Sequence, residues 1–213
     1  PMPGGGFAVT SNPKLEGFLG LESDKGFAVL DLETTGFGKS AEILEIAVIR
    51  LGRYGELIDI WETLICPNSQ IKNSFVHGIT DQLVCDAPTF GEIARELSDL
   101  LHGYVLVAHN LNSFDKPILE AHFERIPEIR IDLGLGLDTM PKPKVKLAEL
   151  CSIHGVTLEP EYAHSAMGDT RALAEVFQKG LTYLTRQTRA VQTDVQANST
   201  LKLARKKVRT NNQ

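Results

Sequence analysis

The stretch Phe27-Ala-Val-Leu-Asp-Leu-Glu33, followed by the turn signal Thr34-Thr35-Gly36, decides the fold. An apolar run without helix caps is typical of a strand buried on both faces. Alternate strand side chains share a face, so Asp31 and Glu33 point the same way, about 6 to 7 Å apart along the strand. Two such carboxylates repel each other and lose hydration unless a cation or hydrogen-bond donors compensate. A divalent cation is the simplest compensation. The alternative is that the strand has left the core by residue 31 and both acids are solvated.

The rest of the chain predicts an α/β domain whose mixed β-sheet is flanked by helices. Strands are expected at 43–51 and 57–65, joined through Gly52-Arg-Tyr-Gly55. Helices then alternate with single strands: a helix opened by the capping box at 89–92, a strand at 104–108, and helices near 115–126, 146–154 and 169–184. Glycines and prolines between 134 and 143 indicate a loop.

Length and composition favour one folded domain. The chain has 213 residues, of which 42% are hydrophobic, enough for one sizeable core. Residues 1–26 are expected to be a loosely ordered lead-in, 27–184 the domain, and 185–213 a basic tail. No long apolar run or secretion-signal layout occurs, and the three cysteines are widely spaced. We therefore expect a cytoplasmic protein without a membrane partner, a disulfide framework or a zinc site.

The charge is distributed unevenly along the chain. From residue 185 onward the net charge is +6, whereas the preceding part carries −11. A basic tail poor in aromatic residues is expected to attract a polyanion. The alternative is a solubilising linker without a specific partner.

Two further acids open predicted helices. Asp169 lies four residues before Leu173, on the same helical stripe as the core residues, and Asp115 opens the helix after the 104–108 strand. Each has an ordinary explanation, Asp169 as a first-turn acid and Asp115 as an N-cap. Together with Asp31 and Glu33, however, they form a set of hard oxygen ligands suited to Mg²⁺ or Mn²⁺. His164 is expected on the preceding loop, where a histidine is suited to removing a proton from water.

Four motifs in order carry a family resemblance: Asp31-Leu-Glu-Thr-Thr-Gly36, His77-Gly-Ile-Thr80, Ala108-His-Asn with Phe114-Asp115, and His164-Ser-Ala-Met-Gly-Asp169. The set resembles the DEDDh (DnaQ-like) family of 3′-to-5′ exonucleases, which contains the proofreading epsilon subunit of DNA polymerase III and ribonuclease T. The resemblance spans about residues 27–181. It implies a ribonuclease H-like fold and two divalent cations, Mg²⁺ or Mn²⁺, held by Asp31, Glu33, Asp115 and Asp169, with His164 as general base.

The resemblance also implies a substrate and its contacts. The expected substrate is the 3′ end of single-stranded DNA or RNA, released as nucleoside 5′-monophosphates in proofreading or repair, with a polymerase or replisome subunit as partner. The residues expected to contact the nucleotide are Thr34, Thr35, Gly36, Phe37, His77 and Asn110. Phe37 has a core or loop anchor as its alternative role. For His77 the alternative is a turn in which Thr80 caps a short helix.

One departure from the family pattern concerns Asp115. Three residues, Leu111, Asn112 and Ser113, separate Asn110 from Phe114, where the family has two. The extra residue either bulges outward or displaces the Asp115 carboxylate.

Two other functions stay open: a catalytically weak nucleic-acid-binding or polymerase-accessory module, and internal cleavage of the ribonuclease H type.

Overall fold

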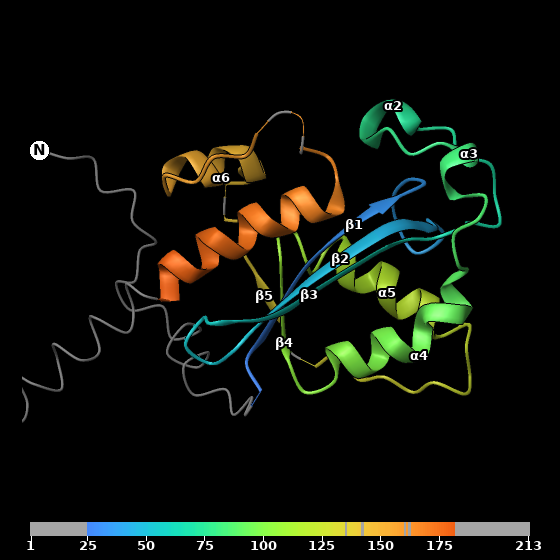
Figure 1. Cartoon of the computed structure of the whole chain (residues 1–213), viewed down its shortest axis with the longest axis horizontal. Coiled ribbons are helices and arrows are strands. Elements are labelled where there is room, and N and C mark those ends of the chain that lie inside the picture. The colour runs from blue at the N-terminus through green and yellow to red at the C-terminus, as the bar shows by residue number, and fades with distance from the viewer. Residues whose placement is uncertain (1–24, 135, 142, 160, 162, 182–213) are drawn as a thin grey trace, which may run out of the picture.

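The run that begins at Phe27 forms the middle strand of a five-stranded sheet (Figure 1). The computed structural model describes residues 25–134, 136–141, 143–159, 161 and 163–181. Apart from Lys25 and Gly26, the lead-in lies outside the described residues, as does the whole basic tail. The order along the sheet is β3-β2-β1-β4-β5. The strands are β1 (Phe27–Thr34), β2 (Ile43–Leu51), β3 (Leu57–Leu64), β4 (Val105–Ala108) and β5 (Gly136–Asp138).

Strand directions confirm the mixed sheet. Strand β2 pairs antiparallel with both β1 and β3, whereas β4 pairs parallel with both β1 and β5. The register of β1 against β2 shifts between Glu33 and Thr34. Such an irregularity bends a strand and redirects its side chains, and it is common beside functional sites. Here it lies directly after the second strand acid.

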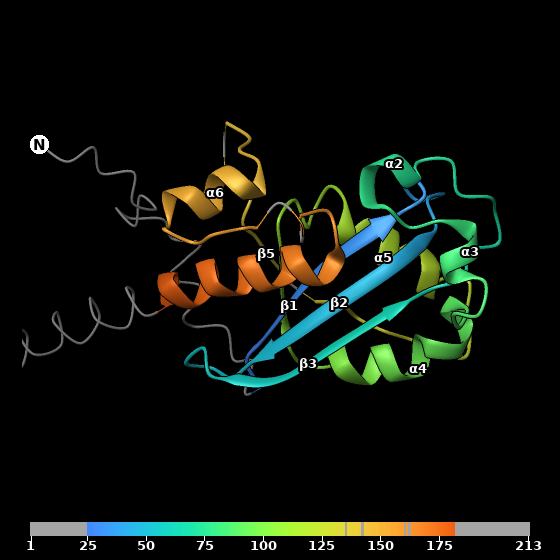
Figure 2. The same cartoon turned by 45° about the horizontal axis from the view of Figure 1, so that its top comes forward.

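Helices cover both faces of the sheet, as Figures 1 and 2 show. Helices α4 (Phe90–Leu101) and α5 (Asp115–Phe123) pack on one face, against a core that includes Ala28, Leu30 and Leu32. Helix α6 (Leu147–Ile153) and the last helix, residues 166–181, pack on the other face with Val29. Since alternate strand residues share a face, Asp31 and Glu33 point toward the last helix. The fold therefore brings β1 and the Asp169 helix together.

Strand β5 was not expected, because its glycines and the nearby prolines predict only a loop. Gly136 explains how a strand forms there. A Cβ at this position would lie 2.3 Å from Leu111 Cδ2 and 3.2 Å from the Leu106 carbonyl oxygen. Glycine therefore lets the backbone approach β4 without displacing Leu111 or crowding the Leu106 carbonyl. The loop prediction is thus wrong for residues 136–138, and the reason is a tertiary contact rather than a local preference.

Two short helices link β3 to α4 and lie near the end of β1. They are α2 (Ser74–His77) and α3 (Asp81–Val84). Gly78 ends α2 with φ 74°, and the Thr80 hydroxyl caps α3 by accepting from the Leu83 amide at 3.3 Å. The structure therefore contains the turn and the Thr80 cap that are the alternative interpretation of the His77-Gly-Ile-Thr80 motif. Among the described residues, no helix is both long enough and apolar enough to cross a bilayer.

Candidate active site

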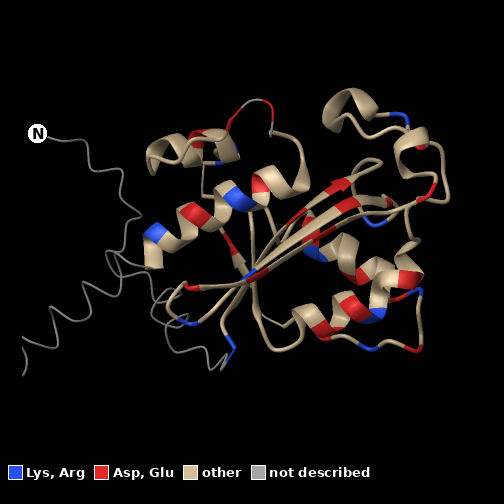
Figure 3. Cartoon of the chain, in the orientation of Figure 1, with Lys and Arg blue, Asp and Glu red and all other residues tan. Residues whose placement is uncertain are grey.

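Three predicted acids meet where β1 ends. Asp31 and Glu33 come from β1, and Asp169 comes from the last helix. One carboxylate oxygen of each lies within 4.8 Å of the others, and all three side chains are half-buried. Asp169 lies 136 positions after Glu33 in the chain, so the fold alone brings it to the two strand acids. Figure 3 shows acidic residues on β1 and β2 toward this end of the sheet.

The fourth predicted acid, Asp115, is buried beside this cluster. Its side chain is 1% exposed, and neither carboxylate oxygen makes a well-formed hydrogen bond among the described residues, although the backbone amides of Asp115 and Leu32 act on it and lower its pKa in part. Asp169 Oδ1 is also buried without a partner. Phe114 is the N-cap residue of α5 and makes no side-chain capping bond, so Asp115 does not serve as the N-cap. A buried carboxylate without a partner is costly in a protein interior.

The pKa values of the acids reflect this crowding. Burial, followed by repulsion from Asp169 and Glu45, raises the pKa of Glu33 from 4.5 to about 8. Burial raises the pKa of Asp31 well above its usual value, and Asp115 is the largest charge acting on it. Burial likewise raises the pKa of Asp169, although nearby His164 opposes the rise. Without a cation, the site therefore favours protonated carboxyl groups at neutral pH.

A metal fits this donor set. The four side chains offer only hard oxygen ligands, which Mg²⁺ and Mn²⁺ prefer. Buried carboxylate oxygens without hydrogen-bond partners are available on Asp115 and Asp169. A divalent cation would offset both the mutual repulsion and the lost hydration of these groups. The chemistry and burial of the residues thus agree with a divalent-cation centre.

His164 stands at the entry to the last helix. It is exposed and has φ 62°, a left-handed conformation that costs energy in a residue with a Cβ. It lies near enough to lower the pKa of Asp169. By contrast, His109 and His122 each engage both ring nitrogens within the fold. His164 is therefore better placed than these two to exchange a proton with a ligand.

Glu45 belongs to the same acidic neighbourhood and was missed from the sequence. It lies opposite Glu33 in the β1–β2 register, and burial raises its pKa. Its Oε2 accepts a hydrogen bond of 2.9 Å from the Ala166 amide, at the start of the last helix. This contact ties β2 to the segment between His164 and Asp169. An acid inside the apolar run Ile43–Leu51 was the available signal, the same one that identified Asp31.

The turn after β1 is held by its own threonines. Thr34 Oγ1 donates to the Gly36 carbonyl at 2.7 Å, and Thr35 Oγ1 accepts from the Glu42 amide at 2.9 Å. Gly36 faces open space, since an added Cβ would meet nothing within 4 Å. Phe37 is 89% exposed, which rules out the alternative that it is a core residue. Its ring packs against that of Phe114 in a T-shaped arrangement, with centroids 6.0 Å apart.

The other two predicted contact residues are His77, the last residue of α2, and Asn110, in the loop after β4. His77 is partly buried and its Nδ1 accepts from the Ile79 amide at 3.1 Å, whereas its buried Nε2 meets no hydrogen-bond partner in the described part of the chain. Asn110 has φ 81° and its carbonyl accepts from the Ser113 and Phe114 amides. This tight turn takes up the extra residue of the third motif. Asp115 accordingly still opens α5 and lies beside Asp31.

Asp138 and Thr139 fix that loop and were not identified from the sequence. The Asp138 carboxylate accepts from the amides of Asn110 at 3.0 Å and Asn112 at 3.1 Å. Thr139 Oγ1 lies 3.0 Å from His109 Nδ1. No local pattern marks these residues, because their partners lie on another loop. They position the segment that leads to Asp115.

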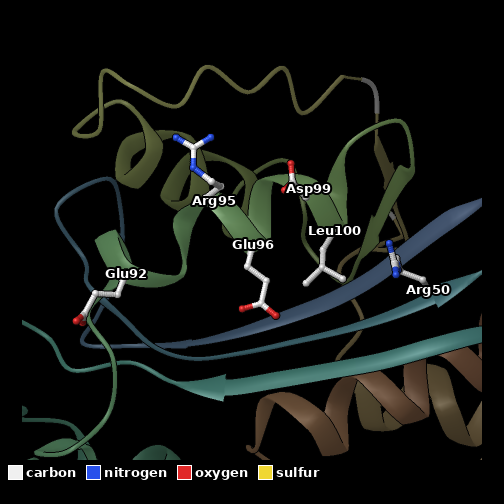
Figure 4. Close-up of a pocket in the computed structure, with 6 residues that line it drawn as sticks. All are labelled: Arg50, Glu92, Arg95, Glu96, Asp99 and Leu100. Carbon is white, nitrogen blue, oxygen red and sulfur yellow. The ribbon is translucent and has the colours of Figure 1, made fainter.

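A hollow of about 560 Å³ lies elsewhere, between α4 and the sheet (Figure 4). Two arginines, three acids and a leucine line it: Arg50, Glu92, Arg95, Glu96, Asp99 and Leu100. Arg50 pairs with Ala28 in the β1–β2 register, near the start of β1 and far along the strand from Glu33. The hollow is therefore separate from the acidic cluster.

Comparison with known proteins identifies the family. The exonuclease family model RNase_T matches residues 28–177, and this chain belongs to that family, whose DEDDh-type members include epsilon-like proteins. A DNA polymerase III subunit epsilon-like protein from Rhodobacter capsulatus is 30% identical over 171 residues, covering 71% of this chain and 23% of that protein. A PolC-type DNA polymerase III from Thermotoga maritima is 32% identical over 168 residues, covering 72% of this chain and 12% of the polymerase. The chain thus spans less than a quarter of either relative.

Solved structures show the same fold. Exonuclease I of E. coli in complex with a dT13 oligonucleotide aligns with a TM-score of 0.63 and 18% identity, over 78% of this chain and 42% of exonuclease I. A 3′-exonuclease that recognises the 3′ end of a histone mRNA stem-loop aligns with a TM-score of 0.58 and 16% identity, over 79% of this chain and 69% of that one. These neighbours confirm the ribonuclease H-like architecture.

Proposed function

We propose that this chain is a 3′-to-5′ exonuclease that removes nucleoside 5′-monophosphates from the 3′ ends of single-stranded DNA or RNA. The observation that carries the proposal is the meeting of three carboxylates within 4.8 Å, beside a fourth that is almost fully buried. Membership of the exonuclease family and the oligonucleotide complex of a structural neighbour support a nucleic-acid substrate.

Each group has a role in this mechanism. Asp31, Glu33 and Asp169 would hold divalent cations, with Asp115 as a further ligand. Bound there, the cations would offset phosphate charge and make water more acidic. His164 takes a proton from the attacking water at a ring nitrogen. The new bond forms between that water oxygen and the terminal phosphorus, while the bond from phosphorus to the preceding 3′ oxygen breaks.

The products follow from this bond change. The last nucleotide leaves as a 5′-monophosphate, and the shortened strand regains a 3′ hydroxyl. We also propose that the partner is a polymerase subunit, since relatives of this chain include DNA polymerase III proteins. Proofreading is then the role that fits the reaction.

Digestion of end-labelled oligonucleotides tests the reaction. With Mg²⁺ or Mn²⁺, a 5′-labelled single strand should give a ladder that shortens one nucleotide at a time, and a 3′-labelled strand should release labelled mononucleotide first. Internal fragments would indicate ribonuclease H-type cleavage instead. Matched DNA and RNA strands in the same assay identify the preferred sugar.

A histidine pair tests the general base. His164→Ala should lower the rate about 10²- to 10⁴-fold with little change in substrate binding. The control is His102→Ala. His102 is exposed just after α4, and the strand that follows it begins at Val105, which pairs with Phe27 at the end of β1 opposite Glu33. Equal rates for both variants would remove the base assignment.

A further inference from the structure

Two phenylalanines are the most exposed large apolar side chains in the described part of the molecule. Phe37 is 89% exposed and Phe75 is 87% exposed. Phe75 lies on α2, a helix of four residues in which no residue is buried. Its ring therefore adds nothing to the hydrophobic core. Its apolar surface is therefore available to a ligand, and covering it would be favourable.

The segments that carry both rings lie close to the end of β1. Asn73, the residue before α2, donates from Nδ2 to the Thr34 carbonyl at 2.8 Å. Phe75 follows Asn73 by two positions, and Phe37 follows Thr34 by three. Figures 1 and 2 both place α2 beside the arrowhead of β1. The hydrogen bond thus holds the two aromatic segments against the same turn.

A lysine accompanies each ring. Lys72 precedes Phe75 by three positions, Lys39 follows Phe37 by two, and both lysines are exposed. Aromatic rings interleaved with cations are the combination that binds single strands, because bases stack on the rings and phosphates meet the charges. The acidic cluster nearby offers phosphate no positive charge of its own. Stacking supplies attraction that does not depend on charge.

We propose that Phe75, together with Lys72, forms a stacking site for an unpaired base upstream of the nucleotide being removed. This inference rests on the proposed function and specifies its substrate: a strand with at least two unpaired nucleotides at its 3′ end, bound without regard to sequence. The terminal nucleotide lies at the acids and Phe37. The preceding part of the strand passes α2.

The test compares two substrates that differ in length. Oligothymidylate reaches Phe75, whereas the p-nitrophenyl ester of thymidine 5′-monophosphate carries one nucleoside and reaches only the acids. Phe75→Ala should raise the KM for oligothymidylate about 10-fold and leave hydrolysis of the ester unchanged. Phe75→Trp, which keeps an aromatic surface, should retain the wild-type KM. The matched control is Leu83→Ala, since Leu83 is a 56% exposed apolar residue on neighbouring α3.

Each other outcome has a separate meaning. An unchanged KM for Phe75→Ala on oligothymidylate overturns the stacking site, and so does an equal loss on both substrates, which would indicate a structural role. Conversion of a dimer to a monomer by Phe75→Ala, seen in sedimentation, would overturn it in favour of a contact between two copies. If the wild type hydrolyses neither substrate, the proposed function fails. Fluorescence anisotropy with labelled oligothymidylate then tests stacking alone: a Kd about 10-fold weaker for Phe75→Ala supports it, and an equal Kd refutes it.

Discussion

Replacing Asp115 with asparagine should stabilise the protein in chelator while it abolishes activity. Burial raises the pKa of Asp115 from 3.8 to about 8. At about 1.4 kcal/mol for each pH unit, this rise costs the folded state about 5 kcal/mol at pH 8. An asparagine carries no charge but leaves a buried amide that costs about 1–3 kcal/mol. Asp115→Asn should therefore gain about 2–4 kcal/mol in EDTA, the difference between these costs.

Thermal unfolding in EDTA measures this gain. For a chain of this size the expected gain corresponds to a Tm higher by roughly 5–15 °C at pH 8. The gain should shrink to about 1 kcal/mol or less at pH 5, where the wild-type carboxyl is protonated in the fold at little cost. Asp86→Asn is the control, because Asp86 is exposed and its replacement should change stability by less than about 0.5 kcal/mol.

Metal addition should reverse the order of stability. Mn²⁺ should raise the Tm of the wild type more than that of Asp115→Asn, since the variant has lost a ligand. The reasoning is refuted if Asp115→Asn is as stable as, or less stable than, the wild type in EDTA at pH 8. That result would mean that the buried carboxylate is already compensated within the fold.

Three further predictions concern Glu33, Glu45 and the basic tail. In EDTA, the free energy of unfolding should fall as the pH rises from about 4.5 to 8, because the folded state holds the Glu33 proton that the unfolded state releases; urea titrations across this range check it, and a rising curve would contradict it. Glu45→Ala should lower kcat about 10-fold or more by freeing the helix start at Ala166, whereas Glu45→Gln keeps an acceptor oxygen and should retain most of the rate; equal losses in steady-state assays would show that charge, not the hydrogen bond, matters. Deletion after Leu184 should weaken oligonucleotide binding and flatten its dependence on salt; an unchanged slope would leave the linker interpretation of the tail.

Much of the fold was predictable because its signals are local. The apolar run at Phe27, the capping box at Thr89 and the stripe through Leu173 each mark one element through spacing alone. The Thr89 prediction holds in detail, since the Glu92 carboxylate accepts from the Thr89 amide at 2.7 Å. Strand β5 escaped because its formation depends on the approach of Gly136 to Leu106, which no local pattern encodes.

The candidate site was predictable to a similar extent. Asp31, Glu33 and Asp169 stood out as acids among core residues, and the structure brings all three together. Glu45 carries the same signal in β2 but was passed over. Asp138 could not be found, because its importance arises from hydrogen bonds to two amides in a separate loop.

The central claim is that four acids distant in sequence hold divalent cations in one centre. Titration of chelator-treated protein with Mn²⁺, followed by electron paramagnetic resonance, tests it most directly. The account predicts two bound ions per chain in the wild type and a loss of this binding in Asp31→Asn, because Asp31 belongs to the cluster with Glu33 and Asp169 and Asp115 is the largest charge acting on it. Undiminished Mn²⁺ binding in Asp31→Asn, or no binding in the wild type, would contradict it.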